Sequence, residues 1–281
     1  MTDLVVQPVS TRKQRRQFLG FPWTLYRDDP NKIPPLRMDQ KELVGYRRHP
    51  FYEKNRAQTF LATRGGEVCG RIAAIVNRGH VEIHKEPRGF FGFFECVDDQ
   101  DVANGLLDAA RAWLAEQGLT SMRGPMSPGI NYVLGTLVEG FDSPPTFLMA
   151  YNPPYYPRLI EGYGFHKSQD LYAFWGNRQM LPATMEKHWP IAEQIVERYN
   201  VNVRELDRSR FRADVETFLE VYNRSMAGHW SFVPMSPAEV RHAAAGLQWL
   251  IVTEPAMAAE IDGKPVGAVF CLPDYNGRIK R

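Results

Sequence analysis

The fold of the first half of this 281-residue chain is decided by the stretch Gly89-Phe90-Phe91-Gly92-Phe93-Phe94-Glu95-Cys96-Val97-Asp98-Asp99-Gln100-Asp101-Val102-Ala103-Asn104-Gly105. Four phenylalanines in five residues predict a strand buried on both faces, and two glycines among them allow a neighbour or ligand to approach the backbone closely. The residues that follow predict an acidic turn and then a helix over 106–114. A phosphate can bind at such a corner, because the first N–H groups of a helix attract anions. The alternative is a packed strand without a ligand.

The composition is typical of a soluble globular protein, and the length predicts about two domains. The chain is 44% hydrophobic and 23% charged, and a net charge of +2 points to neither a nucleic-acid nor a membrane partner. Three widely spaced cysteines, Cys69, Cys96 and Cys271, predict neither a disulfide framework nor a zinc site. We therefore expect no metal and a reduced, cytoplasmic compartment. The sequence has no apolar run of signal-peptide or transmembrane length, so we expect neither secretion nor membrane spanning.

Part of the sequence pattern recurs 197 residues further along the chain. The matched pairs are Gly66 with Gly263, Gly70 with Gly267, and Val6 with Val203. This recurrence predicts two related units in tandem, over 1–178 and 179–281. At the same offset Arg281 corresponds to His84, so the second unit would hold only the N-terminal part of the pattern.

A second unit of this length would leave its hairpin near Asp262-Gly263 with an unpaired edge and an uncovered apolar face, which folded proteins avoid. Two explanations follow. Either the chain is a fragment of a longer protein, or the first unit or a partner subunit in a homo-oligomer covers that edge.

The order of the expected elements resembles the GNAT superfamily of acyl-CoA-dependent N-acyltransferases. That order is strand, helices, hairpin, strand with its corner and helix, strand, helix, strand, and the late helix begins near Asn152 and ends at Gly164-Phe165. Bacterial proteins with two GNAT-like units in tandem carry segments similar to Gly92–Glu95 and Tyr151–Tyr156. The resemblance implies a mixed α/β fold, in which helices flank a GNAT-like central sheet. It also implies direct transfer of an acyl group, from acetyl-CoA or another acyl-CoA, to a small-molecule amine.

The family motif for the coenzyme A pyrophosphate, Gln/Arg-x-x-Gly-x-Gly/Ala, can be aligned here in two ways. One alignment starts at Gln100, and the other is anchored on Leu106-Leu107 and places Asp98 and Asp101 in the motif. Aspartates at this corner would repel a pyrophosphate, so we expect a degenerate CoA loop in the first unit. The resemblance gives a list of candidate cofactor-binding residues, namely Val97, Gln100, Ala103, Gly105 and Asn152.

The candidate catalytic residues are Glu95, Tyr156 and His229. Glu95 matches the place where some family members keep a general base for the amine, and it is alternatively a solvated carboxylate at a strand end. The family's usual tyrosine acid falls at Ile160, so Tyr155 or Tyr156 would substitute for it or would simply pack against the sheet. His229 would act as an acid or base in the second unit. The candidate substrate-binding residues are Trp23, Tyr26, Asn131, Tyr155 and Trp230.

Two other functions fit the sequence. A non-catalytic GNAT-like module would bind a small molecule or a protein partner through the aromatic, proline-rich segment Phe21–Tyr52. An aminoacyl-transfer enzyme would need a basic face for tRNA, which the composition does not provide.

Overall fold

The computed structural model describes residues 3–252 and 255–280, and these form two compact units. The first unit comprises Met1–Lys167, His229–Val233 and Asp274–Arg281, and the second comprises Ser168–Gly228 and Pro234–Pro273. The first boundary therefore falls after residue 167, where the sequence placed it after 178. Arg281, on which the expected end of the repeat was based, lies outside the described residues.

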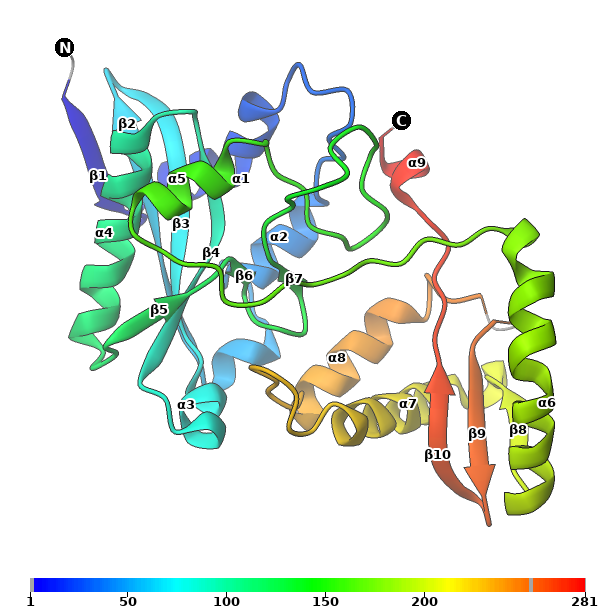
Figure 1. Ribbon diagram of the computed structural model, residues 1–281. Helices are drawn as coiled ribbons and strands as arrows, with labels where there is room; N and C mark the ends of the chain where they lie inside the picture. Colours follow the sequence, from blue (N-terminus) through cyan, green and yellow to red (C-terminus); the bar gives the residue numbers. More distant parts are fainter. Residues whose placement is uncertain (1–2, 253–254, 281) are drawn as a thin grey trace. The chain divides into compact units, whose positions relative to one another are not determined.

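The first unit is built on a five-stranded sheet in the order β1-β2-β3-β4-β5 (Figure 1). The strands are β1 Leu4–Pro8, β2 Arg56–Arg64, β3 Glu67–Val76, β4 Arg88–Cys96 and β5 Ser121–Arg123. Neighbours are antiparallel except β4 and β5, which are parallel and joined through a helix. The β2–β3 turn uses Gly65 and Gly66, whose φ angles of 59° and 86° need glycine. The predicted mixed α/β architecture with a central sheet is confirmed.

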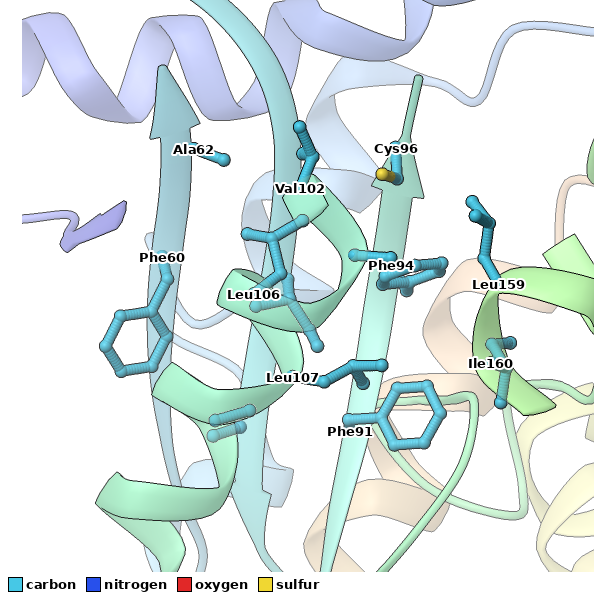
Figure 2. Close-up of a cluster of buried hydrophobic side chains, with 14 of the residues drawn as sticks. Phe60, Ala62, Phe91, Phe94, Cys96, Val102, Leu106, Leu107, Leu159 and Ile160 are labelled. Atoms are coloured by element: carbon cyan, nitrogen blue, oxygen red, sulfur yellow. The ribbon is translucent and has the colours of Figure 1, made fainter. Parts of the chain in front are cut away.

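Helices pack on both faces of this sheet (Figure 1). They are α1 Arg12–Leu25, α2 Arg37–Leu43, α3 Arg78–His84, α4 Gln100–Glu116 and α5 Tyr156–Gly162, with a 3-10 turn at Pro50–Glu53. Figure 2 shows Leu106 and Leu107 of α4 directed toward the sheet beside Phe91. Each fully buried leucine contributes about 1.5–3 kcal/mol to stability, so this face of α4 anchors the helix.

A bulge in β4 changes the alternation of its side chains. The pairing with β3 shifts register between Arg71 and Ala73, and Phe93 has a left-handed φ of 50°. Phe91 precedes the bulge and Phe94 follows it, yet both pack in the cluster formed with α4. A regular strand would place residues three apart on opposite faces.

The bulge decides where Glu95 points. Glu95 lies directly opposite Arg71 in the register, so it shares the face of the sheet on which α1 packs. Without the extra residue, Glu95 would fall on the face covered by α4.

Gly92 allows the segment after β5 to pass close to β4. A Cβ at Gly92 would lie 1.8 Å from the carbonyl oxygen of Met126, and the N–H of Phe93 donates to Ser127 Oγ at 2.8 Å. Met126–Ser127 forms β6, which pairs with β7 at Val133–Leu134.

The second unit has a three-stranded antiparallel sheet in the order β10-β9-β8. Its elements are a 3-10 turn Arg178–Met180, α6 Leu181–Tyr199, β8 Asn202–Glu205, a 3-10 turn Arg208–Arg210, α7 Phe211–Ser225, α8 Pro237–Leu247, β9 Met257–Ile261 and β10 Lys264–Val269. Strand, helices and hairpin thus follow one another as in β1, α1, α2 and β2–β3. The short α9, Asn276–Ile279, belongs to the first unit. Among the described residues, we find no helix with the length and apolarity needed to cross a membrane.

Candidate functional site

Glu95, next to the last residue of β4, accepts two short hydrogen bonds from tyrosines. The hydroxyl of Tyr26 lies 2.6 Å and that of Tyr156 lies 2.7 Å from the same oxygen, Glu95 Oε2. Tyr26 directly follows α1, and Tyr156 is the first residue of α5. The Glu95 side chain is 12% exposed, so the carboxylate depends on protein donors more than on water.

Both tyrosines remain protonated. Burial raises the pKa of Tyr26 and of Tyr156 well above the ordinary value, and the adjacent Glu95 charge raises both further. The two phenols therefore act as hydrogen-bond donors to the carboxylate.

Arg71 of β3 supplies a buried positive charge beside Glu95. Its side chain is 3% exposed, with Nη2 3.6 Å from Glu95 Oε1 and Nη1 donating to the carbonyl oxygen of Phe18 at 2.8 Å. Burial lowers the pKa of Arg71, and Glu95 opposes that shift. A guanidinium stays charged under such conditions because its ordinary pKa is far above neutral pH, so Arg71 balances the Glu95 carboxylate.

Lys32 supplies a second positive charge. Its ammonium lies 3.8 Å from the ring centroid of Tyr26 and 5.4 Å from that of Tyr151. The Tyr151 hydroxyl donates to Asp29 Oδ2 at 2.7 Å, which joins the two loops around the ammonium. Burial lowers the pKa of Lys32 and Arg71 adds to this effect, while Glu95 and Asp29 oppose it.

Chemically, the cluster combines one carboxylate, two neutral phenols and two cations. A carboxylate held by donors at the end of a strand can accept a proton from a reacting group, and a neighbouring phenol can return one. The arrangement therefore suits general acid–base chemistry without requiring a nucleophile from the protein.

The structure brings four of the sequence-predicted site residues together. Glu95, Tyr26 and Tyr156 are bonded directly, and the Tyr155 hydroxyl donates to the carbonyl oxygen of Cys96 at 2.8 Å.

The other predicted catalytic and substrate-binding residues lie in different surroundings. His229 is exposed. Trp230 lies under the Arg123 guanidinium at 4.7 Å, and Trp23 lies under that of Arg37 at 4.6 Å. The Asn131 side chain donates to the carbonyl oxygen of Val233 at 2.8 Å.

The first N–H groups of α4 are capped by the side chain of Asp99, the residue directly before the helix. Asp99 Oδ1 accepts the backbone N–H groups of Asp101 and Val102 at 2.9 and 3.2 Å, and Asp99 Oδ2 pairs with Arg64 at 2.5 Å. The Gln100 amide donates to Asn104 and to α5. These donors are already engaged, so the corner does not fit a pyrophosphate.

The remaining predicted cofactor-binding residues make internal contacts. Ala103 is fully buried in the core, and a Cβ at Gly105 would meet Val6 of β1 at 3.1 Å. The Val97 N–H donates to the carbonyl oxygen of Cys69. The Asn152 side chain accepts from the Leu137 N–H at 2.6 Å and leaves α5 without a side-chain cap.

Sequence reasoning missed Lys32, Arg71 and Tyr151. Arg71 did have a signal, because it is the single charge within the apolar run over 68–76. Lys32 and Tyr151 lie in loops, where no periodicity identifies a buried side chain.

No known protein-family profile matches the chain. The chain is 36% identical over 286 aligned positions to the bacterial ceramide synthase of Caulobacter vibrioides, and 33% identical to protein YghO of Escherichia coli. Each alignment covers 99% of this chain and 72% of the relative. The chain belongs to the family of these two proteins.

Solved structures similar to this family member include a tandem GNAT protein from the clavulanic acid biosynthesis pathway. It has a TM-score of 0.48 and 14% identity, and the match covers 95% of this chain and 73% of that one. The aminoglycoside N-acetyltransferase AAC(6')-Iy in complex with CoA has a TM-score of 0.39 and 13% identity, and the match covers 63% of this chain and 97% of that one. These likenesses concern the fold alone.

Proposed function

We propose that the chain is an N-acyltransferase that moves a fatty acyl group from an acyl-CoA thioester to the amine of a long-chain amino alcohol. One observation carries the proposal: the Glu95–Tyr26–Tyr156 cluster lies in a chain 36% identical, over 99% of its length, to a bacterial ceramide synthase. A ceramide is the amide of a long-chain amino alcohol and a fatty acid, so the name of that relative denotes N-acylation.

In this proposal Glu95 is the general base. It takes a proton from the amine as the nitrogen bonds to the thioester carbonyl carbon, and the carbon–sulfur bond then breaks. The Tyr156 hydroxyl gives its proton to the leaving thiolate and recovers one from Glu95, 2.7 Å away. The products are an amide and a free thiol, and the cluster returns to its starting state. Tyr26 holds the carboxylate in place, and His229 has no role.

Only the acyl end of the co-substrate belongs at Glu95 in this scheme. The N–H groups of Asp101 and Val102 are occupied by Asp99, so the diphosphate is held outside the α4 corner.

The occupied α4 corner is also the observation that favours the second candidate, a non-catalytic binding module. Such a module would bind a ligand beside the paired rings of Tyr26 and Tyr151 and would not convert it into a product.

The test is to incubate the full chain with palmitoyl-CoA and sphinganine, and to measure the N-acyl product by mass spectrometry. Losing a general base costs about 10²–10⁴-fold in rate, so Glu95→Gln should lower the rate by that factor. Thermal unfolding with and without palmitoyl-CoA gives a second readout, since a ligand at about 100 times its Kd stabilises by roughly 2.7 kcal/mol. Stabilisation by palmitoyl-CoA without product would favour the binding module. If palmitoyl-CoA neither stabilises the chain nor yields product, the transferase is excluded.

A further inference from the structure

Among the residues that the structure describes, two cations of the cluster keep N–H donors that form no hydrogen bond: Arg71 Nε, which is buried without a partner, and the Lys32 ammonium, which is less buried than Arg71. The Tyr26 and Tyr156 hydroxyls both donate to Glu95, and Arg71 donates to Phe18 and faces Glu95. The Lys32 ammonium lies over the faces of the Tyr26 and Tyr151 rings, and within residues 3–252 and 255–280 it forms no ion pair with a carboxylate within 4 Å.

The ring contacts favour the charged form of the ammonium and orient it. A cation over an aromatic face is favoured by about 0.5–2 kcal/mol, more as water is excluded. This attraction uses one side of the ammonium and leaves N–H donors directed away from the rings. Lys32 is half-buried, so a group that enters the cluster can reach these donors.

Acyl transfer would move negative charge within this cluster. When Glu95 takes the proton of the attacking amine it becomes neutral, and the electron pair of the thioester carbonyl moves onto its oxygen. The charge thus leaves a carboxylate that has three protein partners and appears on a substrate oxygen that has none. A charged donor already in place would stabilise that oxygen strongly, because little reorganisation is needed.

We infer that Lys32 is a catalytic residue, whose ammonium donates to the carbonyl oxygen of the acyl group and holds the negative charge that develops there. This inference rests on the proposed acyl transfer. When the tetrahedral intermediate collapses, the carbonyl re-forms, the thiolate leaves, and Lys32 keeps its proton throughout. Lys32 thus differs from Glu95 and Tyr156, which exchange protons with the substrates.

The first test compares Lys32→Met, Lys32→Arg and the exposed control Lys54→Met in palmitoyl transfer to sphinganine. Removing one such donor costs about 10²–10³-fold in kcat, so Lys32→Met should lose that factor with the KM for palmitoyl-CoA nearly unchanged. Lys32→Arg should keep more activity, and Lys54→Met should match the wild type. A wild-type kcat in Lys32→Met would overturn the inference.

The second test needs no turnover, and it separates a failure of the inference from a failure of the proposed function. In Glu95→Gln the side chain imitates protonated Glu95, and the carboxylate of palmitate imitates the charged carbonyl oxygen. Isothermal titration should show at least tenfold tighter palmitate binding to Glu95→Gln than to Glu95→Gln/Lys32→Met. If the wild type transfers no acyl group to sphinganine but the difference in palmitate affinity appears, the inference about Lys32 stands, and sphinganine was the wrong acceptor. Equal or absent binding in the two variants overturns the inference.

Discussion

Tyr156 and Glu95 are joined by a 2.7 Å hydrogen bond although 61 residues separate them in the chain. The same Tyr156 hydroxyl accepts the backbone N–H of Cys96 at 2.9 Å. One phenol therefore ties the start of α5 to both the side chain and the backbone at the end of β4. The position of Glu95 is thereby coupled to the packing of α5.

Tyr156→Phe should destabilise the first unit by about 1–3 kcal/mol, because it leaves the buried Cys96 N–H without an acceptor. Tyr155→Phe is the matched control, since it removes only a donor to the carbonyl oxygen of Cys96 and should cost about 1 kcal/mol. Urea unfolding measures both values. A larger loss in Tyr155→Phe would contradict the bridging role.

Arg71→Met should cost about 3–5 kcal/mol, because removing one member of a buried ion pair leaves the other charge uncompensated. The double variant Arg71→Met/Glu95→Gln should be more stable than Arg71→Met alone, since no buried charge remains unbalanced. Denaturant unfolding of the wild type, Arg71→Met, Glu95→Gln and the double variant gives the four values of a double-mutant cycle. If the two substitutions simply add, Arg71 does not balance Glu95.

Gly92→Ala should be among the most damaging small substitutions, because its Cβ would lie 1.8 Å from the Met126 carbonyl oxygen. Overpacking of this kind costs about 3 kcal/mol or more when backbone must move. The control is Gly20→Ala in α1, where a Cβ meets nothing within 4 Å. That substitution should stabilise by about 0.5–1 kcal/mol. Thermal unfolding distinguishes them, and similar effects would argue against the close β4–β6 crossing.

Asp99 should make stability depend on pH at the acid end. Its hydrogen bond to Arg64 lowers the pKa of Asp99 below the ordinary value, despite partial burial. A carboxyl with a lowered folded-state pKa stabilises the protein above its unfolded pKa of about 3.9, and this stabilisation is lost as the pH falls through the folded value.

Asp99→Ala should therefore cost about 0.5–2 kcal/mol at pH 7 through loss of the α4 cap, and less than that at pH 3. Asp101→Ala, an exposed neighbour that caps nothing, is the control. Unfolding free energies at the two pH values provide the check. A cost that is the same at both pH values would show that the Asp99 charge does not matter.

The sequence predicted the elements of the first unit better than the site. The phenylalanine run predicted β4, and the Gly65-Gly66 pair predicted the β2–β3 turn. The helix expected over 106–114 is present, but α4 begins earlier, at Gln100, because Asp99 caps it. The bulge at Phe93 could not be predicted. A bulge shows in sequence only as a break in alternation, and a strand that is apolar on both faces has no alternation to break.

The site residues also differ in whether the sequence carried a signal for them. Glu95 and Tyr156 were predicted from the family resemblance, Glu95 as a general base at the strand end and Tyr156 as a substitute for the family's tyrosine acid. Lys32 belongs to a loop whose path is set by contacts distant in sequence, such as the bond from Asn31 to the carbonyl oxygen of Phe141. His229 and Trp230 were predicted as site residues of the second unit because polar and aromatic residues cluster there, and the structure assigns both to the first unit.

The shared oxygen of Glu95 also has an evolutionary consequence. Tyr26, Glu95 and Tyr156 come from three separate segments, and each buried polar atom in the trio depends on the others. Replacing Glu95 alone would leave two buried hydroxyls without their acceptor, and replacing either tyrosine alone would leave the carboxylate with one donor fewer. We therefore expect related sequences to keep all three residues or to replace them together, so that positions 26, 95 and 156 vary as a set.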